Sequence, residues 1–275
     1  MNNLDAVCQL VRSVLVDTLL FTHPNDLSVS RPAFPFREPW WDWASDTASC
    51  RWMQLFEYYI DPAQRTEWDI PPEFRQLIDQ LSALALPRNP IHIPTEEPLE
   101  ISSRGMSPKK AHEVKQSVAY IANLLHSLGV DPRGVRIVDI GAGQGYLTRA
   151  LQVHLGTTHL LALDSSEIQT QGAQRWQDRT GVIAGSITQK TIHITPMTLC
   201  ESIDEWIGDI SRQEEQGAGP APVLLVALHA CGSLTPDILR SFFVQQNVSK
   251  DRRLWTPIGV IAVGCCYNLL APQGN

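Results

Sequence analysis

The chain has 275 residues, of which 43% are hydrophobic, enough for one large domain or for a domain with an extension. Its formal net charge of −7 excludes a global basic field that would draw it onto nucleic acid or an anionic membrane, so no DNA or membrane partner is expected, although a local basic patch remains compatible with an RNA enzyme. The six cysteines contain no Cys-x-x-Cys pair and indicate no disulfide framework, which favours an intracellular location, cytoplasmic or nuclear.

The N-terminal part, residues 1–100, is predicted to be a mainly helical extension. Apolar residues recur at helical spacing from Leu4 to Leu19, but charged residues interrupt them, so neither a signal peptide nor a membrane span is expected. A further helix is expected over Glu73–Leu86, between prolines on both sides. The proline-rich stretch Pro87–Leu99 is then expected to be a linker to a second domain in residues 101–275.

Aromatic residues gather between these two helices. Such rings could stack nucleic-acid bases, but packing in a core or a domain contact is the favoured interpretation. The members are Trp40, Trp41, Trp43, Trp52, Phe56, Tyr58 and Tyr59.

Ser107-Pro108 has the pattern of a helix start, with serine as the cap and proline at the first helical position. Apolar residues at helical spacing follow, and Gly129 is expected to close the helix. Lys110 lies one turn before Val114, nearly on the buried face. In a doubly wound domain this helix can reach the ligand cleft, so Lys110 could pair with a ligand carboxylate, with His112 close by. A solvated first turn with ordinary lysines is the alternative, and both remain open.

The segment Arg136–Leu151 reads RIVDIGAGQGYLTRAL and organises the domain. It predicts a buried strand, a glycine-rich turn at Gly141, Gly143 and Gly145, and a helix, in the order of a nucleotide-binding half of a doubly wound fold. The glycines let the backbone approach a ligand, and the helix start offers unpaired N–H groups. The spacing GxGxG differs from the dinucleotide fingerprint GxGxxG, so an NAD-dependent oxidoreductase is disfavoured. With Asp139 the pattern becomes DxGxGxG, which resembles motif I of class I S-adenosylmethionine (SAM) methyltransferases.

Four more strands are expected after the glycine turn, with helices between them. The strands are predicted at His159–Leu163, Thr191–Thr195, Val223–Leu228 and Ile258–Val263, and the helices at Ser165–Arg179, Ser202–Ile210 and Thr235–Phe243. Asp164, at the end of the second strand, has nearly the spacing from the glycines at which an acid meets a ribose hydroxyl. Capping of the next helix is a compatible second role for this carboxylate.

His229, Cys231, Cys265 and Cys266 fall at the carboxyl ends of the last two predicted strands. If these strands are neighbours, the four side chains converge and become candidate catalytic residues, with the histidine available to orient or deprotonate a methyl acceptor. Zinc binding by this cluster is one alternative, disfavoured because adjacent cysteines rarely both reach one ion. Burial as small hydrophobic residues is the default interpretation of the cysteines. No metal is therefore assigned.

Several stretches together resemble the methyltransferase-like protein 25 family, whose relatives include the ribosomal RNA adenine dimethylase domain-containing proteins. The stretches are MSPKKAHEV (106–114), VDIGAGQGYL (138–147), LDSS with QGAQR (163–175), LHACG (228–232) and VGCCYNLL (263–270). The resemblance implies a class I methyltransferase (Rossmann-like) fold with SAM as the methyl donor, held by Asp139, Asp164 and the three glycines. Where adenine N6-methyltransferases carry an Asn/Asp-Pro-Pro-Tyr motif, this chain has His229-Ala-Cys-Gly, so the acceptor stays open.

The predicted function is thus SAM-dependent methyl transfer to an unknown acceptor, with RNA or protein favoured. A non-catalytic scaffold that keeps the SAM fold is the alternative. A class I sheet has seven strands, whereas only residues 264–275 follow the fifth predicted strand. The sequence therefore predicts a domain truncated after that strand, with an unpaired edge prone to aggregation.

Overall fold

The computed structural model describes residues 3–10, 43, 51–60, 70–85, 101–177, 182–213, 219–249, 252–266 and 269. The chain divides into two compact units, Met1–Ile91 and His92–Asn275. In the described ranges, no helix has both the length and the apolar character needed to cross a lipid bilayer.

The first unit contains the helices α1 (Asn3–Leu10), α3 (Arg51–Ile60) and α4 (Pro72–Leu84). Trp43 and Tyr58 are buried in its small core. The rings of Trp43 and Phe74 pack edge to face, with their centroids 6.3 Å apart. The Tyr58 hydroxyl donates to the Asp79 carboxylate at 3.0 Å, which pays the cost of burying it. Packing is therefore confirmed as the role of these two aromatic residues.

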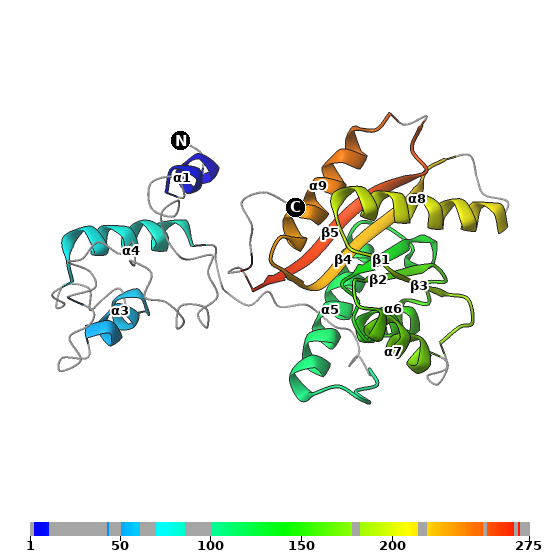
Figure 1. The fold of residues 1–275 in the computed structure, drawn as a ribbon, viewed down its shortest axis with the longest axis horizontal. Helices are drawn as coiled ribbons and strands as arrows, with labels where there is room; N and C mark the ends of the chain where they lie inside the picture. Colours follow the sequence, from blue (N-terminus) through cyan, green and yellow to red (C-terminus); the bar gives the residue numbers. More distant parts are fainter. Residues whose placement is uncertain are drawn as a thin grey trace. The chain divides into compact units, whose positions relative to one another are not determined.

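Five parallel strands form one sheet in the second unit, in the order β3-β2-β1-β4-β5 (Figure 1). The strands are β1 (Arg136–Ile140), β2 (Leu160–Asp164), β3 (Ile187–Thr191), β4 (Ala221–Cys231) and β5 (Trp255–Cys265). The chain steps outward from β1 to β3 and then returns to the other side of β1 for β4 and β5. This reversal between β1 and β4 is a topological switch point, where doubly wound sheets bind their ligands. The predicted doubly wound α/β fold is confirmed.

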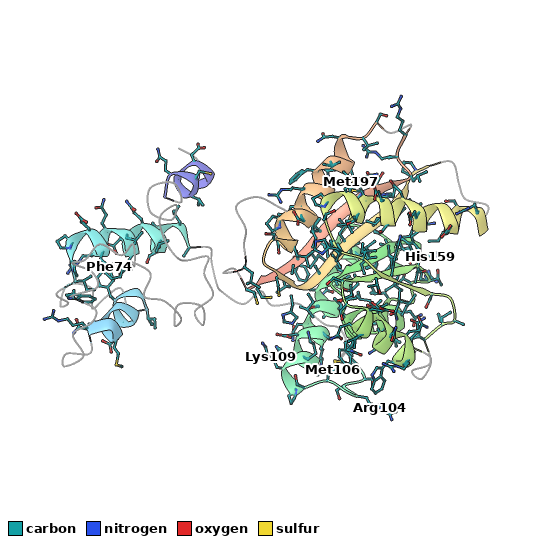
Figure 2. The ribbon with its side chains drawn as sticks, in the orientation of Figure 1. Phe74, Arg104, Met106, Lys109, His159 and Met197 are labelled. Carbon is teal, nitrogen blue, oxygen red and sulfur yellow. The ribbon has the colours of Figure 1, made fainter. Side chains whose placement is uncertain are left out.

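Helices cover both faces of this sheet (Figure 1). On one side lie α5 (Pro108–Ser127), α6 (Tyr146–Leu155) and α7 (Glu167–Gln177), and on the other lie α8 (Pro196–Gln213) and α9 (Leu234–Asn247). Neighbouring residues of β1 serve opposite cores: Ile137 packs with α5 and α6, and Val138 packs with α8 and α9. Side chains fill the space between the sheet and both helical layers (Figure 2). Continuous apolar runs in β1 and β4 follow from this burial on two sides.

Helix α5 begins and ends as its sequence predicts. The Ser107 hydroxyl accepts a hydrogen bond from the Lys110 N–H at 3.3 Å, and Pro108 occupies the first helical position. Gly129 follows the last turn with φ +64°, a left-handed conformation that favours glycine. The same helix buries Val114, Val118, Ile121 and Leu125 against the sheet.

The predicted position of the third strand was wrong. The prediction placed it at 191–195, whereas β3 occupies Ile187–Thr191. Of its five residues only Ile187 is buried, so this strand lacks the apolar run that marks a central strand. Ile192 and Ile194, which suggested a strand, instead pack against the core beneath α8.

Helix α8 begins at Pro196, well before the predicted Ser202. Its start carries a reciprocal cap, because the Thr195 hydroxyl accepts from the Thr198 N–H at 3.2 Å and the Thr198 hydroxyl accepts from the Thr195 N–H at 2.9 Å. The Thr195-Pro-Met-Thr pattern was therefore a helix signal rather than the end of a strand.

Other boundaries differ by smaller amounts. Helix α4 ends at Leu84, β2 includes Asp164, and α9 continues to Asn247. Strands β4 and β5 extend beyond their predicted ends to Cys231 and Cys265. The predictions for residues 11–19, 87–99 and 178–179, for Trp40 and Trp41, and for the side chains of Trp52, Phe56 and Tyr59 lie outside what the structure describes.

Candidate functional site

A cavity of about 330 Å³ lies at the carboxyl ends of the strands, at the switch point between β1 and β4. Its walls come from separate parts of the sequence: Lys110 from α5, the glycine turn after β1, Asp164 from β2 and His229 from β4. The volume falls within the range of small-molecule sites. Six of the predicted site residues, Lys110, Asp139, Gly141, Gly143, Asp164 and His229, line this one cavity.

All three glycines of the turn have positive φ angles, +74° at Gly141, +56° at Gly143 and +66° at Gly145. They differ in what surrounds them. A Cβ at Gly145 would lie 3.2 Å from the Arg149 guanidinium and 3.3 Å from Ala173, so this glycine serves packing between the turn and α7. A Cβ at Gly143 would meet nothing within 4 Å. The backbone at Gly143 therefore borders open space in the cavity.

Asp164 holds the glycine turn against the end of β2. One of its carboxylate oxygens accepts from the Gly143 N–H and the other from the Ser166 N–H, both at 2.8 Å. Both predicted roles are compatible with this geometry, because the Ser166 bond stabilises the start of the next helix while each oxygen keeps a further lone pair toward the cavity.

Asp139 has a structural function that the sequence did not reveal. Gly145, the N-cap of α6, has no side chain to cap the helix, and Thr148 donates both its hydroxyl (2.6 Å) and its backbone N–H to Asp139 instead. Asp139 is only 2% exposed, and burial raises its pKa to about 6 although the Thr148 bonds act in the opposite direction. This carboxylate thus caps α6 from the preceding strand and borders the cavity as well.

His229 pairs with a residue that sequence reasoning missed. Its Nε2 lies 3.0 Å from Oε2 of Glu113, on α5. Lys109 and Lys110 approach the same carboxylate at 3.5 and 3.9 Å. The sequence could have indicated the contact of Glu113 with the two lysines, because Glu113 lies one helical turn after both of them and side chains at that spacing lie next to one another.

These neighbours determine the charge of Glu113. Burial acts to raise its pKa, but the hydrogen bond and charge of His229 and the charges of both lysines outweigh burial and lower the pKa below its usual value. Glu113 is therefore ionised near neutral pH, and its carboxylate holds the Nε2 edge of the His229 ring in place. His112, in contrast, is exposed on α5 and does not line the cavity.

The backbone at His229 is unusual. It has φ +70°, and the pairing of β4 with β5 shifts register between Leu228 and Ala230. A bulge with a left-handed non-glycine residue is costly and is often found at functional sites. Here it turns His229 out of the alternation of the strand, toward α5 and the cavity.

The three predicted cysteines converge, but with one another rather than with His229. The Sγ atoms of Cys231 and Cys265 lie 2.9 Å apart, and all three Sγ atoms lie within 4.8 Å of one another. The hydrogen bond to Cys265, burial and the nearby Cys266 together raise the pKa of Cys231 to about 12. The cysteines are free thiols.

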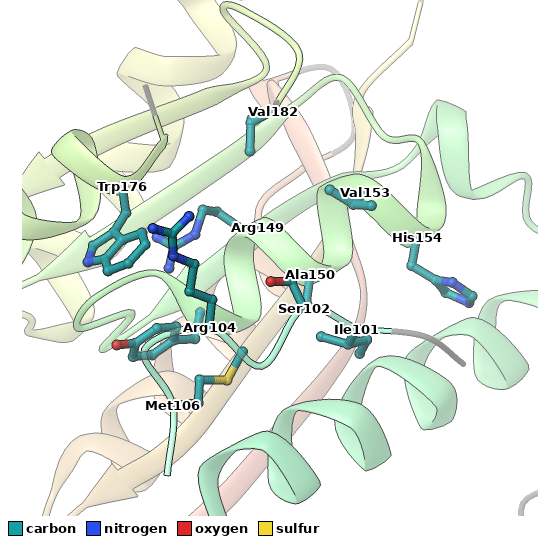
Figure 3. Close-up of a pocket in the computed structure, with 11 residues that line it drawn as sticks. Ile101, Ser102, Arg104, Met106, Arg149, Ala150, Val153, His154, Trp176 and Val182 are labelled. Atoms are coloured by element: carbon teal, nitrogen blue, oxygen red, sulfur yellow. The ribbon is translucent and has the colours of Figure 1, made fainter. Parts of the chain in front are cut away.

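A second cavity, of about 200 Å³, was not expected from the sequence (Figure 3). Trp176, Arg104 and Met106 lie around it, and the Arg104 guanidinium stands 5.8 Å from the Trp176 ring. Tyr146, which donates to the Gly105 carbonyl at 2.6 Å, borders both cavities. None of the predicted catalytic or cofactor residues lines this second cavity.

Solved structures that match this chain include magnesium protoporphyrin IX methyltransferase from Synechocystis PCC 6803 with bound SAH, at 14% identity and a TM-score of 0.31, covering 74% of this chain and 64% of that one. An S-adenosylmethionine dependent methyltransferase from Mesorhizobium loti matches at 20% identity and a TM-score of 0.29, covering 52% of this chain and 51% of that one.

Among curated proteins, "Probable methyltransferase-like protein 25" of Homo sapiens is 33% identical over 79 residues, which is 29% of this chain and 11% of the human protein. A family model described as "Methyltransferase domain" matches residues 109–273, the part of the chain that holds the sheet, the glycine turn and the cavity. Because this match covers more than half of the 275 residues, the chain belongs to the methyltransferase domain family.

Proposed function

We propose that the cavity between α5, the glycine turn and β4 binds SAM, and that the protein transfers the methyl group of SAM to a nucleophilic acceptor. The observation that carries this proposal is the open space at Gly143, beside the Asp164 carboxylate and at the switch point of the sheet. Bound SAM would supply an electrophilic methyl sulfonium.

The chain's own residues would hold the donor in three places. The remaining lone pairs of Asp164 would accept hydrogen bonds from the ribose hydroxyls. Lys110 lines the cavity and would pair with the carboxylate of the methionine part. The backbone around Gly143 would contact the nucleoside, because a side chain there would occupy the space the ligand needs.

His229 would orient the acceptor. In the neutral imidazole whose Nε2–H donates to the ionised Glu113, Nδ1 is left as a hydrogen-bond acceptor. That nitrogen would receive a hydrogen bond from the O–H or N–H group of the acceptor and align its lone pair with the methyl group. Catalysis would then depend mainly on positioning and on exclusion of water.

The experiment has two stages. SAM and its demethylated product are first titrated into the purified chain by calorimetry, with a thermal-shift measurement in parallel; no heat and no shift with either ligand would contradict the cofactor proposal. Tritiated SAM is then added with a cell extract, and labelled material is digested with ribonuclease or with protease. We propose RNA or protein as the acceptor, and the digestion that releases the label identifies which. Binding without any transfer would instead support a non-catalytic scaffold.

A further inference from the structure

We propose that Cys231, Cys265 and Cys266 form a binding site for one zinc ion at the carboxyl ends of β4 and β5. In the described part of the chain, the Sγ atoms of these three cysteines lie close enough to one another to bind a single metal ion. Sulfur ligands select soft ions, and zinc is the usual partner of clustered cysteines. This proposal does not depend on SAM binding, because the cysteines are not among the residues that line the glycine-turn cavity.

The sheet brings the first two thiols together. Cys231 and Cys265 are direct partners in the parallel pairing of β4 and β5, so their side chains emerge side by side. In a tetrahedral zinc site with Zn–S bonds of about 2.3 Å, neighbouring sulfur atoms are about 3.8 Å apart. The Sγ atoms of Cys231 and Cys265 are 2.9 Å apart, and all three Sγ atoms lie within 4.8 Å of one another. Small side-chain rotations are therefore enough to place one ion between the thiols.

The backbone explains how adjacent cysteines reach the same point. Successive side chains of an extended strand point to opposite faces, so adjacent cysteines in a strand rarely both reach one ion. Strand β5, however, ends at Cys265, and Cys266 has φ +46°, a left-handed conformation that is uncommon for a residue other than glycine. This turn brings the Cys266 thiol back beside the other two.

The turn that carries the site is closely packed. A Cβ at Gly232, directly after Cys231, would lie 2.8 Å from the Leu269 carbonyl oxygen, and the Leu269 N–H donates to the Cys266 carbonyl at 2.9 Å. The segments after β4 and β5 thus support each other, and the thiols are positioned in advance of binding. Cys231 and Cys265 are half-buried and Cys266 is exposed, so an ion can enter from solvent.

Three cysteine ligands leave one tetrahedral position for a water molecule or another ligand. Sites with such an open position bind exchangeable ligands, whereas purely structural zinc sites are closed by four protein groups. We therefore expect the ion to be reachable by small ligands, and expect an added thiol to change the absorption spectrum of the Co²⁺-substituted site.

The test is metal binding by the 275-residue chain, prepared reduced and without chelators. Elemental analysis is expected to find one equivalent of zinc. Replacement by Co²⁺ should produce a thiolate-to-metal charge-transfer band whose intensity corresponds to three thiolates. Cys231→Ser, Cys265→Ser and Cys266→Ser should each weaken Zn²⁺ binding by more than about 100-fold, beyond the usual effect of losing a group that only supports a ligand.

Cys200→Ser is the matched control, because Cys200 is a partly buried free thiol on α8 that does not belong to the group. It should retain one zinc and the full cobalt band. Circular dichroism of every variant checks that the fold is intact. Absence of zinc in the wild-type chain, a different metal, or an unchanged cobalt band in all three variants would overturn the proposal. A Cys231–Cys265 disulfide in freshly prepared, unreduced protein, with no metal bound, would overturn it too.

Discussion

His229 Nε2 lies 3.0 Å from Glu113 Oε2, although 116 residues separate the two in the sequence. The contact joins the end of β4 to the second turn of α5, beside the cavity that His229 lines. Because the Glu113 carboxylate holds one imidazole nitrogen of His229, the ring has a defined orientation beside the cavity. This relationship yields the first prediction.

Glu113→Gln should lower methyl transfer on the order of tenfold to a hundredfold, because a ring that loses its charged partner no longer holds the acceptor in line. The affinity for SAM should change much less than the rate, since Glu113 reaches the proposed donor site only through its 3.9 Å ion pair with Lys110. Transfer of label from tritiated SAM and calorimetric titration measure the two effects separately. Glu201→Gln, at an exposed carboxylate on α8, is the control and should change neither. Equal losses in rate and affinity would contradict the positioning role.

Gly143→Ala should weaken SAM binding by at least about tenfold, because the added methyl group enters the space that the ligand needs. The comparison is Gly129→Ala, at a glycine with a similar φ, +64° against +56°, and likewise nothing within 4 Å of its Cβ. Both variants should lose about 1–2 kcal/mol of unfolding free energy from left-handed strain. Only the Gly143 variant should lose affinity in calorimetry; an equal loss in both would remove the argument for a ligand at Gly143.

Asp164→Ala should weaken binding of SAM by about 1.5–3 kcal/mol, the range for lost hydrogen bonds to a charged group. The free energy of unfolding should also fall, because the Gly143 and Ser166 N–H groups lose their acceptor. Asp164→Asn retains a carbonyl oxygen and should fall between the wild type and the alanine variant in both measurements. Titration calorimetry and urea unfolding give the two values, and unchanged affinity in both variants would argue against ribose binding by Asp164.

Asp139→Asn should change how stability depends on pH. Burial raises the pKa of Asp139 to about 6, above its usual 3.8, so the folded state retains a proton that the unfolded state releases between these values. The stabilising contribution of this group is therefore complete below about pH 4 and is lost as the pH rises through 6. Asparagine does not titrate, so the unfolding free energy of the variant relative to wild type should rise between about pH 4.5 and about pH 7.5, by up to about 2 kcal/mol.

Urea unfolding at several pH values measures this difference. Asp131→Asn is the control. The hydrogen bonds from Arg133 lower the pKa of Asp131, so the contribution of this carboxylate to the unfolding free energy varies with pH only below the range tested. Its difference from wild type should stay constant over the same pH range. A constant difference for Asp139→Asn as well would show that this carboxylate is ionised throughout.

The sequence by itself determined the architecture of the second unit, because the signals are local. The apolar run of β1, the glycines that follow it and the Ser107-Pro108 cap each depend on neighbouring residues, and each element formed where it was predicted. Asp164, Gly141 and Gly143 could be associated with one cavity, since parallel strands end at a common edge. The weakly apolar edge strand β3 was misplaced, because burial on one side leaves little hydrophobic pattern.

Only the tertiary structure decided which side chains of that edge meet. Whether His229 faces the cysteines or α5 depends on a bulge and a positive φ, which no residue pattern specifies. The pairing with Glu113 and the capping of α6 by Asp139 likewise join residues whose contact requires the packed sheet. The grouping of Cys266 with Cys231 and Cys265 depends on two features of the backbone: β5 ends at Cys265, and Cys266 itself has a left-handed conformation. Such backbone conformations cost free energy locally and persist because the surrounding fold compensates, so they follow from the whole chain rather than from any segment of it.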